Sequence, residues 1–238
     1  SRWYPGAGIY RKVQMLITDP LHLGIWGTGV TTPVVKPNYA EVRVMNTVHN
    51  KSASSIEKVR LETVIVNAEG IEVARKDATS LIDAGGTKEI ETTIGLSNPQ
   101  RWDLDNPALY TVKTIVYDGD NVCDTHETTF GIRTMRFTAD HGFFLNDKRV
   151  QLKGVNLHHD HGPLGAAFYT RAMERQLQIM KSMGCNAIRT SHNVPAPEVL
   201  DLCDRMGILV YNEAFDKYDR KADIFEDTDF EEFAHRNI

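Results

Sequence analysis

The spacing of apolar residues changes once along the chain, near Phe137, and this change limits the folds that the sequence can adopt. Before Phe137, short runs of alternating β-branched and polar residues are separated by turn-rich stretches such as NKSASS and DAGGTK. The runs are YRKVQMLIT, AEVRVMNTVHN, VRLETVIVN, LYTVKTIVYD and THETTFGIRTMRF. Because short alternating strands at this spacing are typical of antiparallel sandwiches, we predict an immunoglobulin-like β-sandwich over residues 21–137.

Beyond Phe137 the pattern indicates alternating strands and helices. The stretch GFFLNDKRVQLKGVN predicts a hairpin followed by a buried strand. Residues 170–183 have helical periodicity and stop before Gly184, a residue type favoured at helix C-termini. The residues expected on the buried side of this helix are Met173, Leu177 and Met180, with Ala172, Ile179 and Met183 at its edge.

A second helix is predicted to begin near Pro197 and to end at Gly207. Its buried side is expected to carry Val199, Cys203 and Met206. Short apolar runs, NAIRTS and ILVYNE, directly follow the two helices. A strand, helix, strand, helix, strand order requires right-handed crossovers and a parallel sheet. We therefore predict parallel βα units in this half of the chain.

Composition excludes several classes of partner. The net charge is −5 at pH 7 and the sequence pI is about 6.0, so the chain lacks the basic surface of a nucleic-acid-binding protein. The apolar runs are too short to cross a membrane. The three cysteines, Cys123, Cys185 and Cys203, form no CxxC pair, so the sequence supports neither a zinc ribbon nor a disulfide framework.

Polar side chains follow each of the three predicted parallel strands. The strands end at residues 156–158, 189–192 and 212–216. The carboxyl ends of parallel strands meet at one edge of the sheet, where ligands bind. Taken alone, Arg189 or Glu213 at a strand end is equally consistent with a structural ion pair. Polar residues at three strand ends together favour a binding site.

The stretch KGVNLHHDHG, at residues 153–162, places three histidines and an aspartate within four positions. One interpretation is a metal-dependent hydrolase. Neighbouring residues cannot easily turn their side chains onto one ion, however, and metal ligands are usually separated along the chain. We therefore expect no metal site here, and we expect His159 and His161 to be solvated or supporting loop residues.

Together these motifs resemble glycoside hydrolase family 2, which contains β-galactosidases, β-glucuronidases and β-mannosidases. The segments that carry the resemblance are GIYRKV, FGIRTMRF, GFFLNDKRVQLKGVNLHHD, MKSMGCNAIRTSHN and LCDRMGILVYNEAFD. The most specific are NAIRTSHN and KGVN followed by HHD. Within the family, HHDHGPLGAAF and NEAFD are most similar to bacterial β-galactosidases.

The resemblance implies a domain plan of a jelly-roll domain, an immunoglobulin-like domain and a (β/α)8 TIM barrel. Residues 1–20 would then be the last strand of the jelly roll, residues 21–137 the immunoglobulin-like sandwich, and residues 138–238 the first three βα units of the barrel. We therefore expect the sequence to be a fragment of a longer protein. The open edge of such a partial barrel would favour homo-oligomers.

The resemblance also implies roles for residues at the strand ends. His158 and His192 match ligands of sugar hydroxyls, and Arg189 matches a group that orients carboxylates. Glu213 is expected to be a further polar residue of the substrate site, and Asp216 is expected to be part of the same site. A β-galactoside is the expected carbohydrate substrate, with a β-glucuronide or a β-mannoside as the alternative.

The family is retaining and uses two glutamates on later strands of the barrel. The pair Asn212-Glu213 follows the second helix, so it lies on the third strand and is not assigned as the acid/base. The resemblance thus implies that no catalytic residue lies in this chain and that the fragment is inactive. No cofactor is expected, and a divalent cation in the longer enzyme is unsupported. A non-catalytic module that binds carbohydrate or protein is a further alternative.

Overall fold

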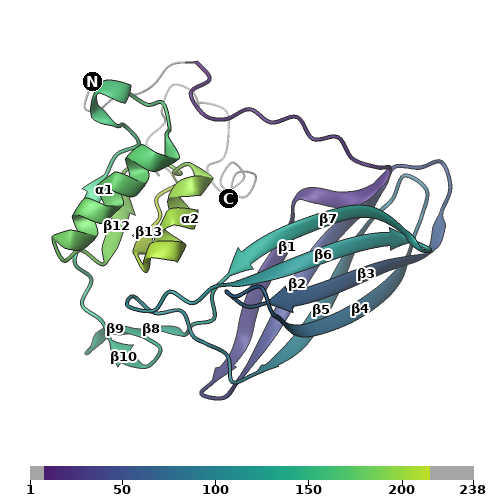
Figure 1. Cartoon of the computed structure of the whole chain (residues 1–238), viewed down its shortest axis with the longest axis horizontal. Coiled ribbons are helices and arrows are strands. Elements are labelled where there is room, and N and C mark those ends of the chain that lie inside the picture. The colour runs from purple at the N-terminus through teal and green to yellow at the C-terminus, as the bar shows by residue number, and fades with distance from the viewer. Residues whose placement is uncertain (1–7, 215–238) are drawn as a thin grey trace. The chain divides into compact units, whose positions relative to one another are not determined.

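The computed structural model describes residues 8–214, which divide into two compact units. One unit comprises residues 14–150, and the other comprises residues 8–13 together with residues 151–214. Figure 1 labels the strands and helices of both units, except β11 and η1. The first unit is built from antiparallel strands, and the second from alternating parallel strands and helices.

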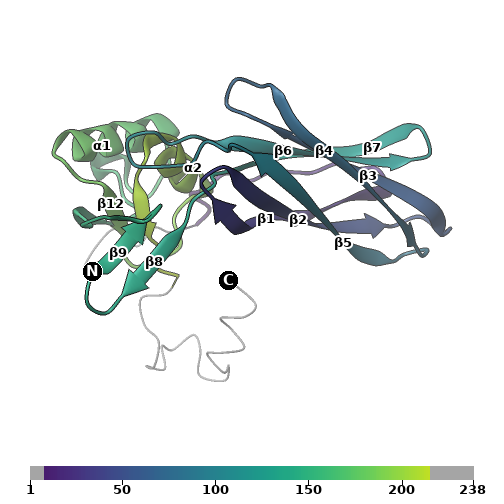
Figure 2. The same ribbon diagram turned by 90° about the horizontal axis from the view of Figure 1, so that it is seen from below.

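Two antiparallel sheets make up most of the first unit and form two layers in Figure 2. The smaller sheet has the order β1 (Leu21–Lys36), β2 (Tyr39–Asn50) and β5 (Thr87–Ser97). The larger sheet has the order β4 (Glu72–Ile82), β3 (Ile56–Val66), β6 (Tyr110–Asp118) and β7 (Asn121–Phe130). This arrangement confirms the predicted immunoglobulin-like sandwich.

Alternation along β2 shows how the sequence fills the space between the two sheets. Ala40, Val42, Val44 and Val48 are fully buried at every second position, as expected for side chains on the inner face of a sandwich. Val44 and Val48 belong to two separate apolar clusters. The inward position between them holds the buried Asn46, so the core is not apolar throughout.

Three strands, β1, β4 and β5, were not among the runs that predicted the sandwich. The pairing of β1 with β2 shifts register twice, which breaks a simple alternation of apolar residues. In β4 only Ile82 is buried, so its apolar pattern is weak. β5 buries every second residue from Ile90 to Leu96, but one of these is Thr92. The alternation of apolar residues in these three strands is therefore too weak to predict them clearly from the sequence.

Residues 8–20 form no strand, since β1 begins at Leu21. The run YRKVQMLIT predicts a strand here, as the last strand of an upstream domain, and the described residues do not form one. The apolar side chains of Ile9, Val13, Met15 and Ile17 are all more than three-quarters exposed. A strand needs a hydrogen-bonded partner, and none of the strands described in this chain pairs with this segment. Its assignment to a jelly-roll domain stays a prediction.

A small antiparallel sheet follows the sandwich and belongs to the same compact unit. Its strands are β8 (Met135–Thr138), β9 (Gly142–Leu145) and β10 (Lys148–Arg149). The predicted hairpin is present as β9 and β10. Asn146, in the turn between them, donates a hydrogen bond to the carbonyl oxygen of Trp102 at 2.9 Å. The compact units divide after Val150, whereas the boundary expected from the sequence lies before residue 138. That domain boundary stays a prediction.

The second unit contains a three-stranded parallel sheet with the order β11, β12, β13. Its elements along the chain are β11 (Gly154–Leu157), the 3₁₀ helix η1 (Gly162–Leu164), α1 (Thr170–Ser182), β12 (Ala187–Thr190), α2 (Pro197–Met206) and β13 (Leu209–Tyr211). This order confirms the predicted parallel βα units. Gly154 is required for close strand pairing, because a Cβ there would lie 2.5 Å from the carbonyl oxygen of Ala187. Self-association through the edges of this sheet stays a prediction.

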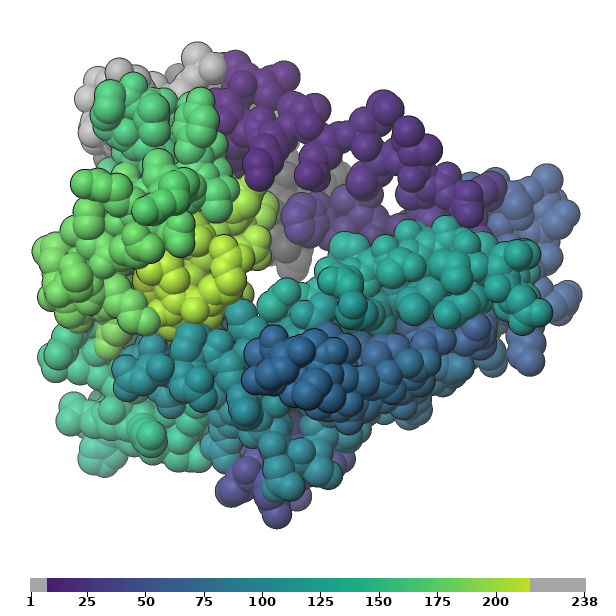
Figure 3. Space-filling view, in the orientation of Figure 1, coloured from purple at the N-terminus to yellow at the C-terminus, as the bar shows by residue number. Residues whose placement is uncertain are grey.

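Helices α1 and α2 pack side by side, as Figure 3 shows in green and yellow. Met173 and Leu177 of α1 are buried in one cluster with residues of α2 and with Ile188 of β12. Ile179 and Met183 are 43% and 72% exposed, so their predicted place at the buried edge of α1 is wrong. They lie too far around the helix to reach the sheet that covers Leu177.

The C-terminal end of α2 forms as the sequence predicts. Gly207 adopts the left-handed conformation, with φ of 66°, and directly follows the last residue of the helix. Pro197 occupies the first turn, where its missing N–H costs no helical hydrogen bond. None of the helices described between residues 8 and 214 is long and apolar enough to cross a bilayer.

Candidate functional site

The register of the parallel sheet places the three strand ends beside one another. Asn156 of β11 pairs with Arg189 of β12, and Arg189 pairs in turn with Tyr211 of β13. Side chains at and just beyond these positions therefore lie at the carboxyl edge of the sheet. This is the edge at which ligands bind in parallel α/β folds.

A buried carboxylate connects two of the strand ends. Arg189 donates hydrogen bonds to Oε1 of Glu213, from Nε at 2.8 Å and from a terminal guanidinium nitrogen. His192 contacts the other oxygen, with 2.7 Å between its Nδ1 and Oε2 of Glu213. Each oxygen of this carboxylate thus binds a different cationic or titratable partner.

The backbone around Glu213 is fixed by further hydrogen bonds across the sheet. The Glu213 amide donates to the hydroxyl of Thr190 at 3.0 Å, and that hydroxyl donates to the side-chain oxygen of Asn212 at 3.0 Å. On the opposite side, the Arg189 guanidinium reaches the side-chain oxygen of Asn156 at 3.3 Å. All three strands therefore contribute to the position of the Arg189–Glu213 pair.

Glu213 is ionised in this setting. Burial by itself would raise the pKa of this carboxyl, but the hydrogen bonds from His192 and Arg189 and their charges outweigh burial and leave its pKa lowered. Glu213 is only 8% exposed. A buried carboxylate of this kind is tolerated because its negative charge is matched by the guanidinium.

The structure brings together four of the five site residues predicted from the sequence. His158 follows β11, and its ring lies edge-on to the ring of His192 with 5.6 Å between centroids. Arg189 and Glu213 lie next to His192 through the hydrogen bonds described above. Asp216 lies outside the described residues. The role of each residue toward a sugar stays a prediction.

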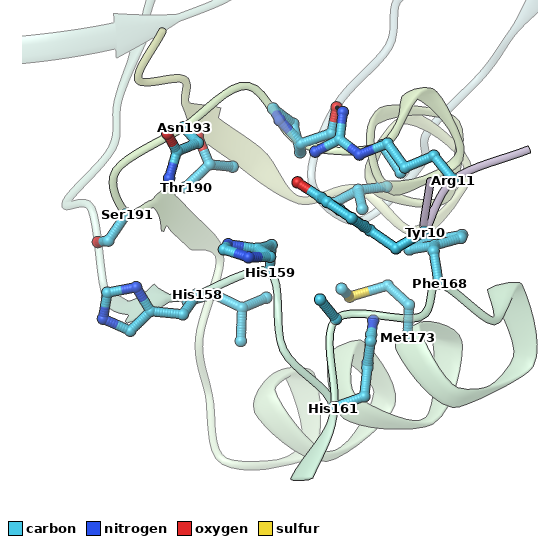
Figure 4. A pocket seen from close by; sticks show the side chains of 15 residues that line it. Tyr10, Arg11, His158, His159, His161, Phe168, Met173, Thr190, Ser191 and Asn193 are labelled. Carbon is cyan, nitrogen blue, oxygen red and sulfur yellow. Dashed lines mark hydrogen bonds between the residues drawn. The ribbon is translucent and has the colours of Figure 1, made fainter. Parts of the chain in front are cut away.

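A small pocket lies beside the strand ends, within the same unit. Its wall includes Ser191 next to β12 and the loop histidines, together with Tyr10, which stacks on His159 at 6.0 Å between ring centroids. Figure 4 shows these side chains around the pocket. Its cavity volume of about 30 Å³ is far below the roughly 300–1,000 Å³ of typical ligand pockets. A sugar ring does not fit in this pocket and would have to lie outside it.

The histidines of the loop after β11 do not converge on one point. Figure 4 shows the rings of His158, His159 and His161 spread across the pocket. Within residues 8–214, no three His, Cys, Asp or Glu side chains are grouped so that they could hold a metal ion. The arrangement of the described side chains therefore gives no support to a metal-dependent hydrolase built on HHDH.

His161 is more deeply buried than its position in a polar loop predicts. It is only 5% exposed and lies edge-on to Phe168, with 5.7 Å between ring centroids. Neither ring nitrogen has a hydrogen-bond partner among the residues that the structure describes. Burial lowers the pKa of His161, while Asp160 raises it and His159 lowers it further. Burial excludes a solvated ring for this histidine and leaves a supporting loop residue, the other alternative expected from the sequence.

Several residues that support this site were not among the site residues predicted from the sequence. Thr190, Asn212 and Asn156 hold the Arg189–Glu213 pair, and Tyr10 packs against the loop from far away in the chain. Thr190 and Asn156 lie in strands that the sequence predicts, so their position at the strand ends could have been predicted. The contact of Tyr10 with His159 could not be predicted in this way, because about 150 residues separate them along the sequence.

Comparison with known proteins assigns the chain to a family. A family model described as "Glycosyl hydrolases family 2, TIM barrel domain" matches residues 138–223, and one described as "Glycosyl hydrolases family 2" matches residues 25–133. The chain belongs to glycosyl hydrolase family 2. The resemblance noted in the sequence is therefore confirmed, and the parallel βα units belong to the TIM barrel domain of this family.

Relatives within family 2 carry two different activity names. "Beta-galactosidase BoGH2A" from Bacteroides ovatus is 47% identical over 93% of this chain and 26% of its own length. A "Putative beta-glucuronidase" from Formosa agariphila is 34% identical over 93% of this chain and 21% of its own length. The chain thus spans about a quarter of the length of the curated relatives that it matches.

Solved structures of glycosidases have the same fold as this chain. A glycosyl hydrolase family 2 member from Bacteroides cellulosilyticus is 43% identical, with a TM-score of 0.84, over 90% of this chain and 29% of that chain. A beta-glycosidase from Bacteroides vulgatus is 29% identical, with a TM-score of 0.86, over 99% of this chain and 30% of that chain. The order of sandwich and partial barrel is therefore shared with these enzymes.

Because His161 is buried, we predict that the folded chain loses stability in acid. Its pKa is lowered in the folded chain, so the unfolded chain binds a proton on this ring more readily, and stability falls as the pH decreases below the ordinary histidine range. We expect His161→Phe to reduce the difference in Tm between pH 7.5 and pH 5, measured by circular dichroism. His126, an exposed residue of β7, provides the control variant His126→Phe. An equal decrease in Tm between pH 7.5 and pH 5 in wild type and His161→Phe would contradict the prediction.

Proposed function

We propose that this chain is part of a retaining glycoside hydrolase that removes terminal β-galactosides. The observation that carries the proposal is the meeting of His158, Arg189, His192 and Glu213 at the carboxyl edge of a family 2 barrel sheet. In TIM barrels this edge holds the active site. The name of the 47% identical relative supports galactose as the sugar.

The chemistry of these side chains suits the recognition of a sugar. An imidazole donates or accepts hydrogen bonds according to its protonation, and so can pair with hydroxyl groups. A guanidinium such as Arg189 orients carboxylates, which are the reacting groups of retaining glycosidases. Hydrogen bonds to sugar hydroxyls that strengthen in the transition state raise the rate instead of merely improving binding. We propose these roles for His158, His192 and Arg189.

A β-glucuronide is the second candidate substrate, because several relatives are named as β-glucuronidases. A glucuronide carries a carboxylate on its sugar and needs a matching positive charge. At the described strand ends, the charge of Arg189 is already balanced by Glu213. This charge balance favours a neutral sugar at this part of the site.

Substrate preference can be tested on the full-length enzyme. We expect p-nitrophenyl β-galactoside to be hydrolysed with a higher kcat/KM than the corresponding β-glucuronide, because a neutral sugar needs no further cation. We also expect a higher kcat/KM than for the β-mannoside, because the 47% identical relative is named as a β-galactosidase. The three substrates share one leaving group, so their ratio reports recognition of the sugar. A higher kcat/KM for the glucuronide would contradict the galactoside assignment and leave the family assignment intact.

The 238-residue chain itself is predicted to be inactive. The resemblance places both catalytic glutamates outside it, and positioning residues cannot replace an acid and a nucleophile. We expect no hydrolysis of p-nitrophenyl β-galactoside by the purified chain, followed by absorbance at high protein concentration. Turnover that persists through purification and disappears in Glu213→Gln would show that Glu213 is catalytic and that the prediction is wrong.

The two histidines at the strand ends are predicted to contribute to catalysis in the full-length enzyme. We expect His158→Ala and His192→Ala each to lower kcat/KM by an amount equivalent to about 1–3 kcal/mol, because a sugar hydroxyl loses its partner. His126→Ala in the sandwich is the control and should leave kcat/KM unchanged. Wild-type kinetics in both site variants, with unchanged Tm, would mean that neither histidine binds the sugar.

A further inference from the structure

We propose that Glu213 is a positioning residue, which holds Arg189 in place and fixes the proton of His192 on Nδ1, and that it does not contact the sugar. The geometry of the described side chains carries this proposal by itself. Its consequence for catalysis rests on the proposed function. It assigns Glu213 a different role from the one that the resemblance implies.

The hydrogen bonds of Glu213 are directed to the protein. Oε1 accepts from Arg189, and Oε2 lies 2.7 Å from Nδ1 of His192. The Glu213 amide is held by Thr190 at the same time, so backbone and side chain are both fixed. A carboxylate with both oxygens engaged in this way is suited to orient its partners.

Burial places Glu213 behind its two partners. Its side chain is 10% exposed, whereas the side chains of His192 and Arg189 are 25% and 39% exposed. Solvent, and therefore a dissolved ligand, has more access to the imidazole and the guanidinium than to the carboxylate. Arg189 and His192 are thus the groups placed to meet a substrate, and Glu213 supports both.

The contact with Glu213 decides which nitrogen of His192 carries a proton. An ionised carboxylate only accepts hydrogen bonds, so Nδ1 must be the donor across the 2.7 Å contact. In the neutral ring Nε2 is then the acceptor. A group that recognises Nε2 of neutral His192 must donate a hydrogen bond, as a sugar hydroxyl does and an ionised sugar carboxylate does not. Glu213 therefore sets the hydrogen-bonding character of Nε2 in His192.

The sandwich provides a matched control for this carboxylate. Glu62 of β3 is also 8% exposed, and it also binds arginine, through Arg60 and Arg75. Its third partner is the hydroxyl of Tyr117, at 3.2 Å, in place of an imidazole. Glu62→Gln therefore removes a charge of similar burial and similar pairing without a direct effect on His192.

The tautomer of His192 can be measured directly on the 238-residue chain. In two-dimensional ¹⁵N–¹H NMR at pH 8, with histidine labelled and with His192→Gln used to assign the signals, we expect the Nδ1–H form to predominate. In Glu213→Gln the amide can donate to Nδ1, so the population of the Nδ1–H form should fall severalfold. Glu62→Gln should leave it unchanged. A wild-type ring protonated on Nε2 would overturn the proposal without reference to any variant, as would an unchanged ratio in a folded Glu213→Gln chain.

Kinetics of the full-length enzyme separate this proposal from the proposed function. We expect Glu213→Gln to lower kcat/KM for the β-galactoside at least tenfold and to change the shape of its pH profile, while Glu62→Gln retains both. If the tautomer result holds and the full-length protein hydrolyses no glycoside, the proposed function fails and the positioning role stands. If the full-length protein is active and His192 is protonated on Nε2, the positioning role fails and the proposed function stands.

Discussion

Parallel pairing of β11, β12 and β13 is the constraint on which the candidate site depends. The register joins Asn156, Arg189 and Tyr211 in one row, so residues far apart in the sequence reach the same edge of the sheet. Close pairing needs the glycine at position 154, where a side chain would collide with β12.

The other end of the strands is held by the side-chain amide of Asn186, which forms hydrogen bonds to the backbone of Gln151 and Lys153. The helices bury one face of this sheet, and its carboxyl edge is left to carry polar groups.

Charge balance links the stability of this edge to its chemistry. A carboxylate as buried as Glu213 is costly unless it is paired and hydrogen-bonded. Arg189 supplies the opposite charge and His192 supplies a further donor, so the group remains ionised despite its burial. The same bonds hold the guanidinium and the imidazole in one orientation. One set of contacts thus orients Arg189 and His192 and also stabilises the buried charge of Glu213.

Sequence alone predicted the βα units well because their limits are set by local chemistry. Gly207 ends α2 in the left-handed conformation, and Pro197 lies in its first turn, as the sequence indicates. The sandwich was predicted as a class, but β1, β4 and β5 escaped notice, since bulges, exposure and an inward threonine weaken their alternation. A strand predicted before Leu21 is not formed within the described residues, because strand formation depends on a partner that local sequence does not reveal.

The candidate site shows a similar limit of sequence reasoning. Strand topology predicted that His158, Arg189, His192 and Glu213 would share one edge, and they do. It did not predict which of these side chains bond to one another, because spacing along a strand fixes position and leaves side-chain direction open. His161 illustrates the same point, since the sequence left a solvated and a supporting ring open, and the structure buries the ring.

Comparison of Glu213 with Glu62 shows why a buried ion pair is weak evidence for a functional site. Both carboxylates are 8% exposed and both bind arginine. Glu62 lies within β3, where its partners come from β3 itself and from the neighbouring strands β4 and β6 of an antiparallel sheet, so its cluster spans the middle of the strands. In both clusters the arginines are more exposed than the carboxylate, so exposure does not distinguish the two places. Glu213 differs because it lies just beyond a parallel strand, at the carboxyl edge of the sheet. The pairing is similar in the two places, and the topology that surrounds it gives only Glu213 a route to a ligand through Arg189 and His192.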